Sequence, residues 1–158
     1  MEPRTSSPTR RIEAIQKLAE AGISVGVCTA PLIPGINDEE MPAVIAAASD
    51  AGASFASYTI VRLPHSVEDI FLNWLQREFP SRREKVIARL RSLGGGQIRR
   101  SEFGVRMGGE GPWSEQIRGL FRLACRKAGI ENSPKKLSTD HFRRTGGRQL
   151  TFLDSLVE

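Results

Sequence analysis

The sequence has few cysteines and no long apolar run, and each shortage excludes a class of protein. Two cysteines occur in 158 residues, Cys28 and Cys125, too few for a disulfide framework and without the CxxC spacing of a metal site. No apolar stretch reaches the length of a membrane span, and the N-terminus MEPRTSSPTRR lacks the apolar centre of a secretory signal. With 39% hydrophobic and 26% charged residues, we expect a globular cytoplasmic protein without a membrane partner.

Positive charge is concentrated in the second half of the chain. Residues 1–80 contain 6 Lys and Arg against 10 Asp and Glu, whereas residues 81–158 contain 17 against 8, and the net charge is +5. This asymmetry is typical of a nucleic-acid surface, and it is equally typical of a solvated face. Nucleic acid is therefore a candidate partner of the basic half, with the solvated face as the alternative.

The first 63 residues show the same pattern twice, a helix ended by Ala-Gly and followed by a strand. Apolar spacing predicts a helix over 8–21 and a mostly apolar strand over 23–30, buried on both faces as in a parallel sheet. Asp38 predicts the cap of a second helix, and the strand 54–63 follows it. Two such units predict a parallel α/β architecture.

The rest of the chain is predicted to be helical. Helices are expected over 66–79, 81–93 and 114–128, with a glycine-rich loop over 97–113. Only two strands are convincing, and a sheet of two parallel strands leaves its edge N–H and C=O groups unpaired. The chain is therefore predicted to be part of a larger sheet, whose other strands are missing or come from another copy in a homo-oligomer.

The segment APLIPGIND, residues 30–38, joins the first predicted strand to the second helix. Its prolines each remove a backbone donor and fix φ, and its glycine lets the backbone turn without a side chain in the way. In parallel α/β folds, ligands bind at the carboxyl ends of the strands. Apolar side chains beside unpaired backbone groups suit a flat purine better than a phosphate, because no glycine-rich anion nest is present. A rigid turn without a ligand is the alternative.

Several segments in order resemble the C-terminal half of radical SAM proteins, closest to the group of DNA repair photolyases and spore photoproduct lyases. They are EPRTSSPTRRIEAIQKLAEAGISVGVCTAPLIPGINDEEMPAVIAAASDAGA, YTIVRLPHSVEDIF, NWL and FGVRMGGEGPWSEQIRGLFRLAC, and the resemblance extends from Glu2 to about Phe152. It implies a partial (β/α) barrel with a C-terminal helical extension. In that family, a 4Fe–4S cluster reduces S-adenosylmethionine (SAM) to give a carbon-centred radical.

The resemblance also implies which residues form the adenosine side of the SAM pocket. The proline-rich corner matches the motif that packs on the adenine, the junction before the first helix contacts the ribose or carboxylate, and the last strand ends on the same face. The residues so implied are Arg4, Ser6, Pro31, Leu32, Ile33, Pro34, Gly35, Leu63 and Pro64.

The chain departs from the family at the cluster. The CxxxCxxC loop that holds it is absent, and neither Cys28 nor Cys125 has the spacing to replace it. We therefore expect no cluster and no SAM cleavage on this chain alone, and a missing N-terminal half or a separate chain as its partner. The expected regions are 1–66 as two α/β units of the barrel, 67–130 as a basic helical extension and 131–158 as a polar tail.

Other interpretations come from different features. The chain could be a non-catalytic nucleic-acid-binding fragment that uses its basic helices, or an unstable remnant of a longer gene. Trp113 could stack on a base or hold its own loop in place, and His65 could face a substrate or simply pack. The ending QLTFL, residues 149–153, loosely resembles peptides that dock on the bacterial sliding clamp.

Overall fold

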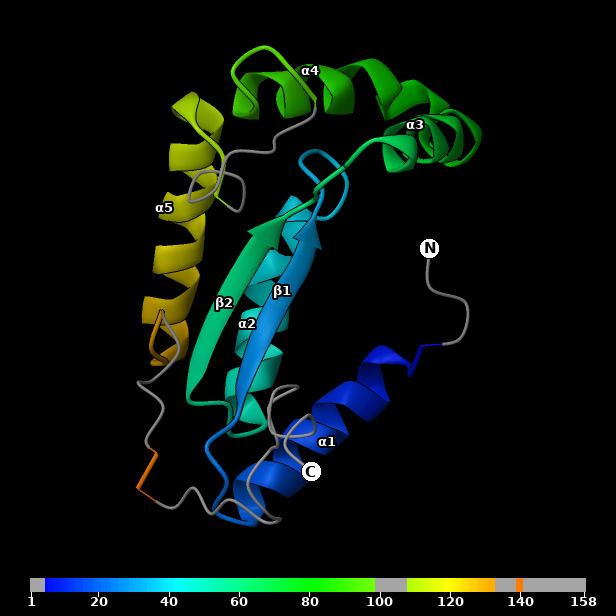
Figure 1. Ribbon diagram of the computed structural model, residues 1–158. Helices are drawn as coiled ribbons and strands as arrows, with labels where there is room; N and C mark the ends of the chain where they lie inside the picture. The colour runs from blue at the N-terminus through cyan, green and yellow to red at the C-terminus, as the bar shows by residue number, and fades with distance from the viewer. Residues whose placement is uncertain (1–4, 99–107, 133–138, 141–158) are drawn as a thin grey trace, which may run out of the picture.

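The computed structural model describes residues 5–98, 108–132 and 139–140. In these residues five α-helices and a two-stranded parallel sheet form a mixed α/β arrangement (Figure 1), as the sequence predicts. The sheet does not close into a barrel within the described residues. The elements are α1 (Pro8–Glu20), β1 (Gly26–Leu32), the 3-10 turn η1 (Asp38–Glu40), α2 (Met41–Asp50), β2 (Phe55–Ile60), α3 (Ser66–Glu78), the 3-10 turn η2 (Pro80–Arg82), α4 (Arg83–Leu93) and α5 (Gly111–Ala128).

The helices surround the sheet unevenly (Figure 1). Helix α2 lies along one face of the strands, α5 stands on the side of β2, and α3 and α4 cross beyond the carboxyl ends of both strands. Helix α1 lies on the side of β1 and is turned away from the sheet. No residue of α1 is buried, so the apolar face predicted for this helix is only partly covered.

The two strands pair in parallel, with Val27 opposite Ala56 and Cys28 opposite Ser57. Residues of one face pack against the helices, and Ala56 in that face is fully buried. On the other face Cys28 and Ala30 are exposed. The prediction that this strand is buried on both faces is therefore wrong, because no described element covers the second face.

The two edges of the sheet differ. On β2, the amide of Ala56 donates to the carbonyl of Glu131 at 2.8 Å, and the amide of Glu131 donates to the carbonyl of Ser54 at 3.1 Å. This single parallel bridge lies just after α5 and pairs Glu131 with the β2 edge at Phe55. The opposite edge, on β1, has no strand partner among the described residues. Within the described residues the sheet is thus open along one edge and one face.

Two apolar clusters hold the elements together. The first joins the sheet to α2 and α5, and its buried members are Leu32, Met41, Ile45, Ala56, Ile60, Leu93, Ile117, Phe121, Ala124 and Cys125. The second joins the corner after β1 to α3 and α4, and its buried members are Ile33, Leu63, Phe71, Leu75, Val86, Ile87 and Leu90. Helix α5 therefore shares a core with the α/β units. No helix in the described ranges is long and apolar enough to cross a bilayer.

Local signals place most helix ends correctly. The Ser7 hydroxyl accepts from the amide of Arg10 at the start of α1, and Gly129 ends α5 in the left-handed conformation with φ 69°. Asp38 is the exception, because it begins the 3-10 turn and α2 starts only at Met41. The carboxylate of Asp38 accepts from the amide of Gly35 instead.

The register of the sheet can be tested at Gly26, which lies opposite Phe55. A Cβ atom on Gly26 would lie 2.2 Å from the Phe55 ring. We expect Gly26→Ala to lower the free energy of unfolding by about 1–3 kcal/mol, the usual cost of overpacking. Urea unfolding of the single variants and of Gly26→Ala combined with Phe55→Leu measures the coupling. The double variant should lose less free energy of unfolding than the two single variants lose together. Strict additivity of the two losses would contradict the register.

Candidate functional site

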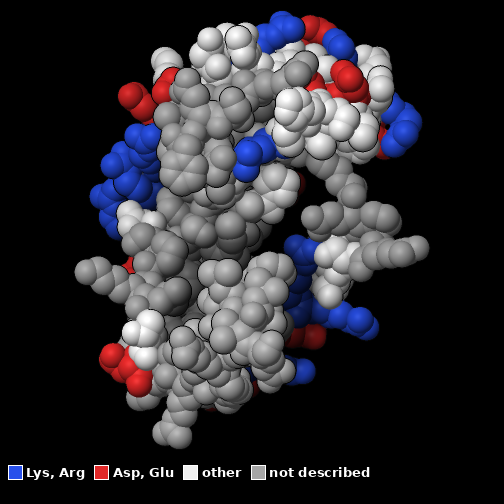
Figure 2. Space-filling model, in the orientation of Figure 1, with Lys and Arg blue, Asp and Glu red and all other residues white. Residues whose placement is uncertain are grey.

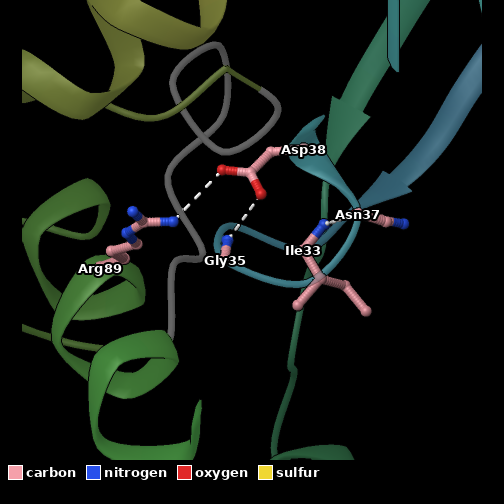
Figure 3. Close-up of polar contacts among 5 residues, drawn as sticks. All are labelled: Ile33, Gly35, Asn37, Asp38 and Arg89. Carbon is pink, nitrogen blue, oxygen red and sulfur yellow. Dashed lines mark hydrogen bonds and ion pairs between the residues drawn. The ribbon is translucent and has the colours of Figure 1, made fainter. Parts of the chain in front are cut away.

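The corner after β1 is held by two side chains of its own segment (Figure 3). The amide of Ile33 donates to Asn37 Oδ1 at 2.7 Å, and Asn37 Nδ2 donates to the carbonyl of Pro31 at 3.1 Å. The amide of Gly35 donates to Asp38 Oδ1 at 2.8 Å. The expectation that these backbone groups are unpaired is therefore wrong, because Asn37 and Asp38 already occupy them.

The corner is also fastened to α4 and α5. Arg89 Nη1 lies 3.3 Å from Asp38 Oδ2, and the two side chains are only 13% and 14% exposed. The guanidinium carbon of Arg89 lies 4.1 Å from the centre of the Trp113 ring, an arrangement that adds cation–π attraction. Trp113 thus contacts Arg89 of α4 and lies in the first turn of α5, which begins at Gly111, inside the stretch 97–113 that is expected from the sequence to be a loop.

A groove of about 720 Å³ opens between α1, β1 and α2. Its volume lies in the range of small-molecule and cofactor sites. The lining is mainly apolar, with Ile15 from α1 and Val44 from α2, and Val44 is 39% exposed. Polar groups gather near the start of α1, where Ser6 and Arg11 line the groove and Arg11 donates to the hydroxyl of Thr5. The groove can therefore accept a ligand with an apolar body and a polar end.

The open edge of β1 forms one wall of this groove. The carbonyl of Val25 accepts from the amide of Ser54 at 2.9 Å, so it points towards β2. Because backbone groups alternate in direction along a parallel strand, those of Gly26 and Cys28 point away from β2, ahead of the register shift between Thr29 and Leu32. The groove wall thus combines apolar side chains with main-chain donors and acceptors.

The implied adenosine residues fall into two groups. Ser6, Pro31 and Leu32 line the groove. The others lie elsewhere: Ile33 and Leu63 are buried in the second cluster, Pro34 is among the largest fully buried side chains, Gly35 faces Arg89, and Pro64 is exposed beyond β2. Arg4 lies outside the described residues, as do the residues 149–153 of the clamp-like ending.

The groove also contains residues that the sequence did not indicate as ligand contacts. Arg11, Cys28 and Val44 all line it. Arg11 follows the helix cap Ser7 by one turn, and Val44 lies on the apolar face of α2, so their residue types alone gave no signal for a ligand. His65 is exposed and directly precedes α3 as its N-cap residue with φ 40°, a conformation that non-glycine residues rarely adopt.

The thiols and acids give no metal site in the described ranges. No group of three or more His, Cys, Asp or Glu side chains that could hold a metal ion occurs there. Cys28 is exposed and Cys125 is buried, and burial raises the pKa of the Cys125 thiol above its ordinary value. The described residues therefore do not fit an iron–sulfur cluster, whose ligands are clustered thiolates.

Comparisons with known proteins gave no match, either to family models, to curated proteins or to solved structures.

The contact between Asp38 and Arg89 can be measured by a double-mutant cycle. Asp38→Asn keeps an oxygen for the Gly35 amide and loses the ion pair, and Arg89→Gln removes the same pair from the other side. We expect a coupling free energy of about 1–2 kcal/mol in urea unfolding, because both groups are shielded from water.

A second ion pair on the same protein provides the control. Arg77 and Glu78 lie 2.7 Å apart, but their side chains are 74% and 46% exposed, and such surface pairs contribute little. The same cycle there should show no measurable coupling. Equal coupling free energies for the two pairs would contradict the role of Arg89 in holding the corner against α4.

Proposed function

We propose that this chain is the C-terminal portion of a radical SAM-type protein related to the DNA repair photolyases, and that its groove holds the adenosine part of SAM. One observation carries the proposal: a cofactor-sized groove opens beside a parallel strand and reaches its carboxyl end, where Pro31 and Leu32 line it. In parallel α/β proteins this end of the strands is where ligands bind.

The shape of the sheet supports the same proposal. Two α/β units lie side by side in parallel, and in the part of the chain that the structure describes the sheet is open along the β1 edge and on the face that carries Cys28. An incomplete barrel leaves the interior face of its sheet uncovered. A further chain or segment that covers this face beyond the groove is therefore part of the proposal.

The lining of the groove fits the parts of the cofactor. Apolar side chains of α1 and α2, such as Ile15 and Val44, would pack against the flat adenine. The hydroxyl of Ser6 and the guanidinium of Arg11 would bind the ribose or the carboxylate, since guanidinium groups pair well with carboxylates. The corner residues Ile33 to Gly35 would support the groove from below without touching the ligand, because they pack on α4.

Radical chemistry is not assigned to this chain alone. When bound, SAM supplies a carbon-centred radical only after it accepts an electron, which in the family comes from an iron–sulfur cluster. Because the described residues offer no ligand group for a cluster, we propose that the chain binds and orients the cofactor and that its partner carries the cluster.

Cys28 allows a direct test of the groove. It is exposed and lines the groove, whereas Cys125 is 1% exposed and its thiol pKa is raised by burial. At pH 7–8 iodoacetamide should alkylate Cys28 first, because the thiolate is the reactive form and access to Cys125 is blocked. We expect millimolar SAM to slow alkylation of Cys28 in a saturable way, read by peptide mass spectrometry, with methionine as a control ligand that protects less.

Two matched variants separate a specific ligand from a general effect. Val44→Trp places a large ring in the groove and should abolish the protection by SAM. Val67→Trp makes the same change on α3 at a residue that is 42% exposed and does not line the groove, and it should leave the protection unchanged. Equal alkylation of Cys28 with and without SAM would contradict the proposed function.

A further inference from the structure

Helix α5 carries a row of arginines on its outer face. Arg118, Arg122 and Arg126 are spaced by four residues and exposed, so they follow one side of the helix, and Lys127 adjoins them. Figure 2 shows Lys and Arg gathered on the side of the molecule where α5 lies in Figure 1. We call these three arginines the arginine row.

The arginine row has no acidic partner in the described part of the chain. None of its members forms an ion pair there, and the one polar side-chain contact is from Arg118 Nη2 to the hydroxyl of Ser114 at 3.5 Å. Glu115, also exposed, is the single acidic residue of α5. Three guanidinium groups are thus held in line by a helix whose other face is fixed in the core.

Gly119 lies between these arginines and has no structural explanation. A glycine inside a helix is less stable than alanine, and a Cβ atom on Gly119 would meet no heavy atom within 4 Å. Packing therefore does not require this glycine. Absence of a side chain there would let an elongated ligand lie directly against the helix between the arginines.

We propose that the outer face of α5 binds the phosphodiester backbone of a nucleic acid, with Arg118, Arg122 and Arg126 on successive phosphates and Gly119 allowing close approach. The row extends for about 12 Å along the helix at 1.5 Å per residue. One strand of a duplex passes about three or four phosphates in that length of its axis. The proposal is independent of the cofactor groove, which lies on the β1 side of the sheet rather than beside α5.

Other anionic partners fit this surface less well. A helix that binds a membrane surface inserts its apolar face, but here Ile117, Phe121 and Ala124 are buried in the core. A protein interface needs an apolar centre, and among the described residues beside the arginine row Leu123, at 43% exposed, is the one exposed large apolar side chain. Guanidinium groups on either side of a helix position without a side chain, here Gly119, favour phosphate groups as ligands.

The test is a salt titration of binding by the full chain. Fluorescently labelled 20-nucleotide probes, one duplex DNA and one single-stranded RNA, are titrated in fluorescence anisotropy between about 50 and 200 mM salt. Three phosphate contacts predict a slope of log K against log salt of about −2.7 on the duplex. Each single Arg→Gln change should reduce this slope by about one. The two probes show whether duplex DNA or single-stranded RNA binds better.

Two sets of variants make the test specific. Changing all three arginines of the row to Gln should weaken binding at least about tenfold at low salt, whereas Arg10, Lys17 and Lys85, exposed on α1 and α4, changed together to Gln remove the same charge and should have little effect. Gly119→Gln should raise the melting temperature and weaken binding, while Gly119→Ala should raise the melting temperature with binding changed less than about twofold.

The outcomes that would overturn the proposal are distinct. The proposal fails if neither probe binds at low salt, or if the two triple variants lose the same affinity. It also fails if Gly119→Gln binds as tightly as the unchanged protein. Binding to vesicles with one fifth phosphatidylserine that requires the arginine row, without binding to either nucleic acid, would show a membrane surface instead. None of these measurements involves SAM, so their outcome does not depend on whether the groove binds this cofactor.

Discussion

The architecture depends on one carboxylate, that of Asp38, which serves two groups at once. One oxygen accepts from the Gly35 amide and the other pairs with Arg89, and Arg89 in turn lies over Trp113. The corner after β1, helix α4 and the start of α5 therefore meet at a single polar point between the two apolar clusters. A corner held in this way keeps the carboxyl end of β1 in one place, which a binding groove beside it requires.

The second constraint is the open edge of β1. Main-chain donors and acceptors along a strand are costly to leave without partners away from water. In this protein they border a groove whose other walls are the half-covered helix α1 and the exposed Val44 of α2. Edge, groove and uncovered face form one continuous surface that the described chain does not fill. On the opposite side of the molecule, one face of α5 is packed in the first apolar cluster and its outer face carries the arginine row.

Much of the local structure follows from nearby residues, and the candidate site follows only in part. Ser7, Gly52 and Gly129 mark helix ends correctly because caps and left-handed turns depend on neighbours within one turn. The resemblance implied Ser6, Pro31 and Leu32, which do line the groove, together with Ile33 and Leu63, which are buried elsewhere. Adjacent positions of the corner point to different sides, and nothing in their residue types separates them.

By itself the sequence determined the two parallel α/β units, the stiff corner between them and the basic helix, since periodicity, proline, glycine and charge act over a few residues. Only the tertiary structure decided that Asp38 serves the corner instead of a helix start, because its partner Arg89 lies 51 positions away. It also decided where the groove opens and which arginines stand in a row without acids, because these properties depend on which distant elements approach each other and which do not.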